Sequence, residues 1–296
     1  MDEFLTVAAV ARRLGVAPAT LRTWDRRYGL GPSLHEAGNH RRYCAKDLAK
    51  LTMMRRLISA GVAPAQAAQR ALSHEGEMSL AKIISHCTNA LEAIDAMYSA
   101  TSALDQVLLR TMLAHEILDH GIVVAWEEVF VPVLQRIDSH WKEKSGSAEV
   151  EHIFFTQILK GVIHENTSEI TAPLNAHPIL LASVGDELHC LALHALSAAL
   201  AERSVSSFFL GPRTPLLALQ IMVERSAPPA IFLWAQASVG ADPKFLREIP
   251  AIRPAPRIVL GGPGWEREEC IGAIFAEDLE FACEEMARAV GAAINL

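Results

Sequence analysis

The sequence predicts a multidomain fold: an N-terminal winged helix-turn-helix, an all-α four-helix bundle and a C-terminal α/β unit with a doubly wound parallel sheet. Three observations predict it. Near the N-terminus, two short helical patterns flank a Gly-containing turn and precede a basic extended segment. A long middle stretch has helical periodicity with little Gly or Pro, and the last third alternates buried-strand and helix patterns. We expect domain boundaries at residues 1–76, 77–168 and 169–296.

Composition bounds the class of protein. With 51% hydrophobic and 21% charged residues, the 296-residue chain is globular, and its apolar runs are shorter than the roughly 18 residues of a membrane span. The cysteines are far apart and lack C-x-x-C or zinc-ligand spacing, which predicts free thiols in the cytoplasm. They are Cys44, Cys87, Cys190, Cys270 and Cys283.

Charge is distributed unevenly along the chain. Residues 1–76 hold 12 Lys and Arg against 6 Asp and Glu, whereas the remainder holds 15 against 28. Clustered cations neutralise phosphates, so a basic N-terminal segment on an acidic body predicts a domain that binds a polyanion.

The basic segment contains two predicted helices. "TVAAVARRLGV" has helical apolar spacing and ends at Gly15, and "PATLRTWDRRYG" starts at Pro18 and ends at Gly29. Leu21 and Trp24 are expected to pack inward. Three arginines share a broad face of the second helix, namely Arg22, Arg26 and Arg27.

An extended basic segment follows, His40-Arg41-Arg42-Tyr43, after Gly and Pro turn signals. It is typical of a wing whose cations contact phosphates, with Tyr43 either a phosphate donor or a core residue. A small helical domain with solvated arginines is the alternative. Because cations recur on two successive elements, the pattern favours DNA binding.

"TVAAVARRLGVAPATLRTWDRRYGLGPSLHEAGNHRRY" resembles the N-terminal domain of MerR-family transcription regulators. The resemblance implies that the second helix enters the major groove, that the wing grips the backbone, and that dimers bind a palindromic operator in double-stranded DNA. Ala17 departs from the family's capping Ser. The implied DNA contacts are Thr20, Arg22, Arg26, Arg27, Tyr28, His40, Arg41, Arg42 and Tyr43.

The middle stretch predicts helices at about 80–98, 102–117, 121–142 and 148–164, which form a four-helix bundle. Pro132 lies inside the third and is expected to kink it. A plain bundle explains the apolar positions, but not the sequence Trp141 followed by Glu151-His152.

The last third reads as buried strands alternating with helices. Strands are predicted in "PILLASVG", "VSSFFLG", "PPAIFLWAQ" and "PRIVLGG", with a weak one near Ile274-Phe275. Helices are predicted in "HCLALHALSAALAERS", "PLLALQIMVERS", "PKFLREI" and "LEFACEEMARAVGAA". This order predicts a Rossmann-like sheet with ligands at the carboxyl ends of its strands.

The first of those ends carries Glu187-x-His189. A carboxylate close to a neutral imidazole orients a metal-ligating nitrogen, although a lone His in such a loop is often a structural cap. "GDELHCLALHALSAAL", "LGPRTPLLAL" and "VLGGPGW" together look like the cobalamin-binding domain of methyltransferases and mutases. That resemblance implies His189 as the lower axial ligand of cobalt, with Glu187, Gly211, Gly261 and Gly262 around the cofactor.

Two positions depart from this pattern. Ala192 replaces the glycine that ends the loop fingerprint, which adds a methyl group close to the corrin. Trp234 lies where a small Ser usually ends the third strand and lines the slot for the cofactor's nucleotide tail. An indole that points into the slot weakens or alters cobalamin binding.

The three parts in this order resemble the CarH/LitR group of adenosylcobalamin-dependent photoreceptor repressors. In that group a Trp is followed ten and eleven residues later by Glu-His, the spacing of Trp141, Glu151 and His152. These residues would hold the adenosyl group. Lys142 replaces the His that binds cobalt after light, and an ammonium has no lone pair for a metal. His140 lies on the other side of the Trp.

The expected function is a DNA-binding transcriptional repressor whose homo-oligomeric state, dimer or tetramer, and DNA affinity are controlled by cobalamin, with adenosylcobalamin as the expected form and light sensing as one mode of control that the resemblance implies. The alternative is a MerR-type regulator with a degenerate cobalamin domain that responds to another small molecule or to a protein partner. An enzyme, as a corrinoid methyl carrier, is disfavoured because a carrier has no use for a helix-turn-helix and no separate catalytic constellation is visible.

Overall fold

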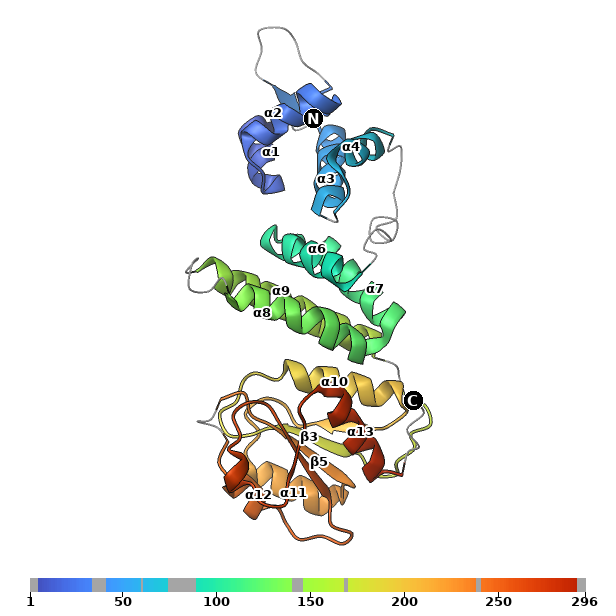
Figure 1. Cartoon of the computed structure of the whole chain (residues 1–296), viewed down its shortest axis with the longest axis vertical. Helices are drawn as coiled ribbons and strands as arrows, with labels where there is room; N and C mark the ends of the chain where they lie inside the picture. The colour runs from blue at the N-terminus through green and yellow to red at the C-terminus, as the bar shows by residue number, and fades with distance from the viewer. Residues whose placement is uncertain are drawn as a thin grey trace. The chain divides into compact units, whose positions relative to one another are not determined.

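A computed structural model describes residues 5–33, 41–59, 61–73, 89–139, 146–167, 170–237 and 241–291 (Figure 1). Internal contacts divide the chain into two compact units. The first comprises Met1–His115 and Val129–Ile158, and the second comprises Glu116–Glu128 and Leu159–Leu296. The division runs through the helical middle, which contributes segments to both units. The three-domain boundaries stay a prediction.

The first unit begins with a helix-turn-helix. Thr6 caps the first helix by accepting a hydrogen bond from Ala9 N at 3.3 Å, and Gly15 and Gly29 end the two helices with φ of 64° and 71°. Ala17 makes no side-chain cap at the start of the second helix, because a methyl group cannot accept a hydrogen bond. The elements are β1 (Leu5–Thr6), α1 (Val7–Leu14), α2 (Pro18–Tyr28), β2 (Arg42–Tyr43), α3 (Ala45–Ser59) and α4 (Pro64–Leu72).

The extended segment predicted as a wing forms β2, which pairs antiparallel with β1. Leu5 lies opposite Tyr43 and Thr6 lies opposite Arg42, so successive side chains of β2 face opposite ways. Arg42 is exposed, whereas Tyr43 is fully buried and is among the largest side chains of the core. Its hydroxyl is buried and has no hydrogen-bond partner among the described residues, and burial raises the pKa of Tyr43. Tyr43 is therefore a core residue, and its assignment to the DNA contacts is corrected.

This burial predicts opposite outcomes for two substitutions of Tyr43. Tyr43→Phe removes a buried hydroxyl that has no partner, so the free energy of unfolding should stay the same or rise. Tyr43→Ala empties the core position and should lower the free energy of unfolding by about 3–5 kcal/mol. Urea denaturation measures both, and DNA affinity that falls in Tyr43→Phe would return Tyr43 to the phosphate contacts.

The helical middle is interrupted at two places. Gly121 adopts φ 76° and ψ 165° inside α7, at the break predicted between the second and third helices. The irregularity predicted at Pro132 takes the form of a π-helical turn that ends two residues before the proline. No helix among the described residues is long and apolar enough to cross a membrane. The elements are α6 (Ala90–Ser102), α7 (Gln106–Ala125), η1 (Trp126–Phe130), α8 (Val131–Ser139) and α9 (Ser147–Asn166).

The second unit contains the predicted parallel sheet, with strand order β4-β3-β5-β6-β7. The strands are β3 (Ile179–Ser183), β4 (Ser207–Phe209), β5 (Ala230–Trp234), β6 (Arg257–Gly261) and β7 (Ile274–Phe275). The helices are α10 (Leu191–Glu202), α11 (Leu216–Ser226), α12 (Lys244–Arg247) and α13 (Leu279–Ala289). Helices α10 and α13 cover one face of the sheet, and α11 and α12 cover the other (Figure 1). Each strand and helix predicted for this region is confirmed.

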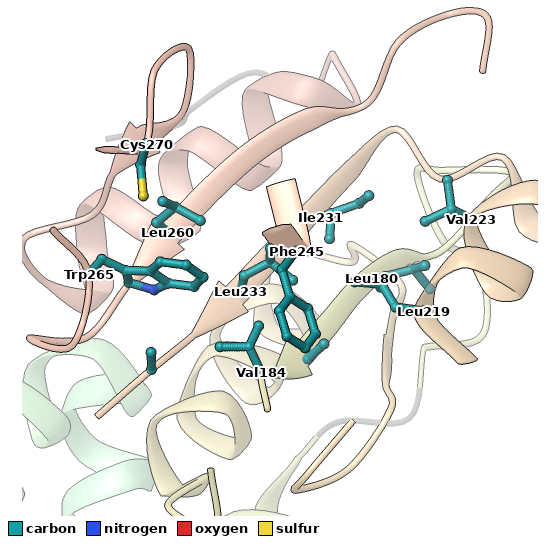
Figure 2. Close-up of a cluster of buried hydrophobic side chains, with 12 residues drawn as sticks. Leu180, Val184, Leu219, Val223, Ile231, Leu233, Phe245, Leu260, Trp265 and Cys270 are labelled. Atoms are coloured by element: carbon teal, nitrogen blue, oxygen red, sulfur yellow. The ribbon is translucent and has the colours of Figure 1, made fainter. Parts of the chain in front are cut away.

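The core of this unit explains the uninterrupted apolar strands. Leu180 and Val184 point to the face covered by α11 and α12, where they join Leu233, Leu219 and Phe245 (Figure 2). Every residue of β3 is buried, because helices cover both faces. Alternation along the strands directs Ser183 and Trp234 to the opposite face, at the carboxyl ends of β3 and β5.

Candidate functional site

The second helix of the helix-turn-helix has one apolar and one cationic face. Leu21 and Trp24 are buried, as predicted. Three arginines of α2 are exposed, namely Arg22, Arg26 and Arg27, while Thr20 and Tyr28 are half-buried. Helical spacing thus separates the residues that hold α2 in place from those available to a polyanion.

The wing carries a partly neutralised cation. Arg41 donates from Nε to Asp25 Oδ2 of α2 at 3.1 Å, and both side chains are partly exposed. No local sequence pattern marks Asp25 as part of the wing contact. Its position one turn before Gly29 brings its carboxylate to the wing, so that Arg41 links the two elements while Arg42 stays exposed. His40 lies outside the described residues.

The loop after β3 is built around Glu187. This side chain is only 3% exposed, and its carboxylate accepts four hydrogen bonds. Oε1 accepts from His189 N and pairs with His189 Nδ1, both at 2.7 Å. Oε2 accepts from the backbone of Gln236 and Ala237, after β5, at 2.8 and 3.1 Å. The structure therefore brings Glu187 and His189 together, at the carboxyl edge of the sheet.

These contacts favour the ionised form of the Glu187 carboxylate and one tautomer of a neutral His189 ring. Burial raises the pKa of Glu187, but the hydrogen bonds from His189, Gln236 and Ala237 outweigh it and hold the pKa below its ordinary value. An ionised carboxylate at Oε1 makes Nδ1–H of His189 a donor, which leaves the lone pair on Nε2. The His189 side chain is 70% exposed. An oriented, accessible imidazole nitrogen of this kind can ligate a metal.

Two further loops meet this site. Arg213 N donates to the Glu187 carbonyl at 2.9 Å, and Val184 forms a bridge to Thr214, so the loop after β4 lies beside Glu187. Gly211 opens that loop with φ 99°. Thr214 Oγ1 donates to the Gly211 carbonyl at 2.9 Å. These contacts place the loop that contains Gly211 beside Glu187, and the role of Gly211 at a cofactor stays a prediction.

The paired glycines at the end of β6 allow close approach. A side chain at Gly262, which has φ 94°, would come 2.2 Å from the carbonyl oxygen of Ala235. One at Gly261 would meet Phe232 at 2.3 Å and Trp234 at 3.2 Å. The indole of Trp234 therefore packs over Gly261 on the face of the sheet covered by α10 and α13.

Trp234 and Ser183 are register partners on neighbouring strands. The Trp234 Nε1 and the Ser183 Oγ are both buried, and neither has a hydrogen-bond partner among the described residues. Buried polar groups in folded proteins usually have partners. These two unpartnered groups lie on neighbouring strands at the carboxyl ends of the parallel sheet, which makes this position a candidate for contact with a ligand.

The predicted pair Glu151-His152 lies on α9. Glu151 is buried and its Oε2 has no partner among the described residues, whereas His152 Nδ1 contacts Asp138 Oδ1 of α8 at 2.9 Å. Asp138 was not singled out from the sequence. The other predicted residues of this segment lie outside the described residues, namely His140, Trp141 and Lys142.

Comparison with known proteins defines the class of the N-terminal segment. Residues 5–74 match the family described as MerR HTH family regulatory protein. This range contains α1, α2, the wing and α4, and residues 5–74 are a MerR-type helix-turn-helix domain.

One curated relative extends the likeness over nearly the whole chain. It is the HTH-type transcriptional repressor CarH of Myxococcus xanthus, 27% identical over 286 residues. The alignment covers 94% of this chain and 91% of the relative.

Solved structures with similar folds include two corrinoid proteins. A monomethylamine corrinoid protein of Methanosarcina barkeri matches with a TM-score of 0.47 and 12% identity, over 69% of this chain and 99% of its own. A cobalamin-binding protein of Desulfitobacterium hafniense matches with a TM-score of 0.35 and 19% identity, over 66% of this chain and 98% of its own.

The hydrogen bonds of Glu187 predict a pH-dependent contribution to stability. Glu187→Gln should lower the free energy of unfolding by about 1–3 kcal/mol at pH 7, because an amide cannot accept all four bonds. Since the folded-state pKa lies below the unfolded one, this contribution is present above the unfolded pKa and is lost as pH falls through the folded pKa. Denaturation of both proteins from pH 7 to pH 3 should show the difference shrinking.

Glu224→Gln provides the control, because Glu224 is an exposed residue of α11. It should leave the free energy of unfolding within about 0.5 kcal/mol of the wild type. A Glu187→Gln difference that is constant over the whole pH range would show that the carboxylate charge does not matter.

Proposed function

We propose that this chain is a transcriptional repressor that binds double-stranded DNA through its MerR-type domain and is controlled by a corrinoid bound to its C-terminal α/β unit. The observation that carries the proposal is the Glu187–His189 pair: a buried carboxylate orients an accessible imidazole at the carboxyl edge of a parallel sheet. The CarH repressor, similar over nearly the whole length, supports the combination.

The DNA-binding part of the proposal rests on the exposed arginines of α2 and β2. Arg22, Arg26 and Arg27 would reach the major groove, and Arg42 a phosphate. Thr20, Tyr28, His40 and Arg41 complete the proposed contacts. A helix-turn-helix of this kind reads a palindromic operator as a homo-oligomer in the cytoplasm, with the dimer as the minimal unit.

At the sheet edge, His189 fits a corrinoid, whereas Trp234 opposes the usual binding of its nucleotide tail. His189 would offer Nε2 to cobalt, and Glu187 fixes the orientation of the imidazole ring. Around them, the lack of side chains at Gly211, Gly261 and Gly262 allows the backbone to approach closely. Adenosylcobalamin is the proposed form, and when bound it supplies a cobalt–carbon bond that light can break. Trp141, Glu151 and His152 are proposed for its upper ligand, and Glu151 has an orphaned buried oxygen for this purpose.

A second candidate function is favoured by Trp234. Its indole packs over Gly261, where the resemblance places the slot for a nucleotide tail. A regulator of the same architecture that responds to another small molecule, or to a protein partner, would keep the DNA-binding domain and use this altered edge differently.

Arg26→Ala tests the DNA-binding part. Loss of a phosphate or base contact should weaken binding by roughly tenfold. Where the lost contact is to a phosphate, the slope of log affinity against log salt should also fall by about 0.9, because fewer counterions are released. Fluorescence anisotropy with a duplex selected by the wild-type protein from random-sequence DNA, at several salt concentrations, measures both quantities.

The matched control is Arg225→Ala, since Arg225 is an exposed arginine of α11 in the other unit. It should bind like the wild type at every salt concentration. Weaker binding with an unchanged salt slope in Arg26→Ala would mean that Arg26 reads a base or supports the helix, and makes no phosphate contact.

His189→Ala tests the corrinoid part. The wild-type protein incubated with adenosylcobalamin should retain it through gel filtration with an absorption spectrum typical of cobalt bound by histidine, and green light should then change the spectrum. His189→Ala should weaken retention by about 10–100-fold, because a metal ligand is lost. His177→Ala, at an exposed histidine before β3, is the control.

Each outcome decides between the candidate functions. No retained corrinoid in the wild type would contradict corrinoid control and leave the second candidate. Retained corrinoid without a light-dependent change would keep the repressor as a sensor that works in the dark. A wild-type spectrum in His189→Ala would remove His189 from the axial position.

A further inference from the structure

Asp105, between α6 and α7, contacts two adjacent arginines of α3. Its side chain is 7% exposed. Oδ2 accepts from Arg55 Nη2 at 3.3 Å and from Arg56 Nε at 3.1 Å, and Arg56 Nη2 also reaches Oδ1 at 3.5 Å. The arginines are mostly buried as well, at 11% and 23% exposed. These are charge-assisted bonds in a site that largely excludes water.

The same carboxylate fixes the start of α7. Asp105 Oδ1 accepts from Leu108 N at 3.2 Å, which caps the helix. The preceding residue, Leu104, has φ 51°, a left-handed conformation that residues with a side chain seldom adopt. The backbone is thus held in an unfavourable turn at the point where Asp105 meets both the helix and the arginines.

Arg55 extends the connection into the helix-turn-helix. Its Nη1 donates to the carbonyl of Leu14 at 3.4 Å. Leu14 is the last residue of α1, so this carbonyl lies at the turn that joins α1 to α2. Asp105, Arg55 and Leu14 therefore form one continuous path from the first residues of α7 to the turn between the DNA-binding helices.

The two ends of this path belong to different parts of the chain. Arg55 and Arg56 lie inside the matched MerR-type domain, whereas Asp105 lies beyond it. We propose that Asp105 is a positioning residue that transmits rearrangements of α7 to the α1–α2 turn through Arg55 and Arg56, and so couples the ligand-controlled helices to DNA binding. The proposal rests on the proposed function for its ligand and its DNA.

The chemistry of a buried ion pair suits this role. Moving the carboxylate away leaves buried guanidinium groups without their counter-charge, a state much less stable than the paired one. Arg55 Nε is buried without a partner among the described residues, and the Leu14 carbonyl that accepts from Nη1 carries no charge to replace that of Asp105. A shift of α7 must therefore either move α3 with it or break the ion pairs of Asp105 with Arg55 and Arg56. These alternatives are two discrete states of the contact.

Asp105→Asn isolates this contact. Asparagine keeps the size and the helix cap but removes the charge. In the full-length protein without ligand, hydrogen exchange should accelerate about tenfold in peptides covering residues 10–20 and 50–59, while the peptide covering 106–113 stays protected. Asp95→Asn is the control, because Asp95 of α6 pairs with Arg136 of α8, and both residues lie outside the DNA-binding domain.

Coupling has a second readout that a merely structural role would not move. The ratio of DNA affinities with and without adenosylcobalamin should fall to within about twofold of one in Asp105→Asn, while the spectrum of the bound corrinoid stays that of the wild type. Adding Arg56→Gln to Asp105→Asn should change the ratio no further, because both substitutions break one interaction.

Two results for Asp105→Asn would overturn the proposal. One is wild-type hydrogen exchange in both peptides that cover residues 10–20 and 50–59. The other is faster exchange there with an unchanged ratio of DNA affinities. If the wild-type protein itself shows no effect of adenosylcobalamin on DNA affinity, the proposed function fails. Exchange in the peptide covering residues 10–20 then decides by itself whether Asp105 holds the α1–α2 turn.

Discussion

The Glu187 carboxylate is the interaction on which the candidate ligand site depends. Glu187 joins three segments of the chain: its own loop, the loop after β4 through the bond from Arg213 N to its backbone carbonyl, and the residues after β5 through the bonds from Gln236 N and Ala237 N to its carboxylate. A buried charge is stable only when its hydrogen-bonding capacity is used, and here all four acceptor positions are used. The same bonds that satisfy Glu187 hold His189 in one orientation, so folding and site assembly are one event.

Carboxylates that accept backbone N–H groups recur where segments distant in sequence meet, and Asp47 among them is buried. Asp47 accepts from Ser33 N and Cys44 N and so ties the segment after α2 to the start of α3. In the second unit, Glu202 of α10 accepts from Ile122 N beside the break at Gly121. Glu127 accepts from the first two amides of α13. Charged acceptors at helix starts are favoured by the helix dipole, which explains why acids occupy these positions.

Two such carboxylate contacts involve the two ends of α7. Its first turn is capped by Asp105, which contacts the DNA-binding domain, and its last part is held by Glu202 within the unit that contains the sheet. One helix therefore has its two ends attached to the two units. Gly121 lets the helix depart from regular geometry close to the Glu202 contact, where a continuous helix would leave the Ile122 amide bonded within the helix and unable to meet Glu202.

Sequence patterns predicted the elements of the sheet well because each strand is a continuous apolar run set off by Gly or Pro. They placed Glu187 beside His189 because two residues in one short loop are necessarily close. They could not decide Tyr43, since an aromatic residue with a hydroxyl suits either a core or a phosphate, and only pairing with Leu5 settles its direction. Asp105 and Asp138 were missed because their partners lie 49 and 14 residues away, and no local pattern reports such contacts.

Trp234 shows how a single residue alters what an unchanged fold can bind. The sheet edge keeps the Glu187–His189 pair, whose geometry depends on backbone amides and not on the residue at the end of β5. The indole nevertheless occupies the face over Gly261, and within the described part of the chain neither its Nε1 nor the neighbouring Ser183 hydroxyl has a hydrogen-bond partner. A ligand that satisfies both groups must bring a hydrogen-bond acceptor to the indole N–H. A flat part of such a ligand could also stack on the face of the indole ring. The orientation of His189 and the environment of Trp234 are thus set independently: the first depends on Glu187 and backbone amides, and the second on side-chain packing over Gly261.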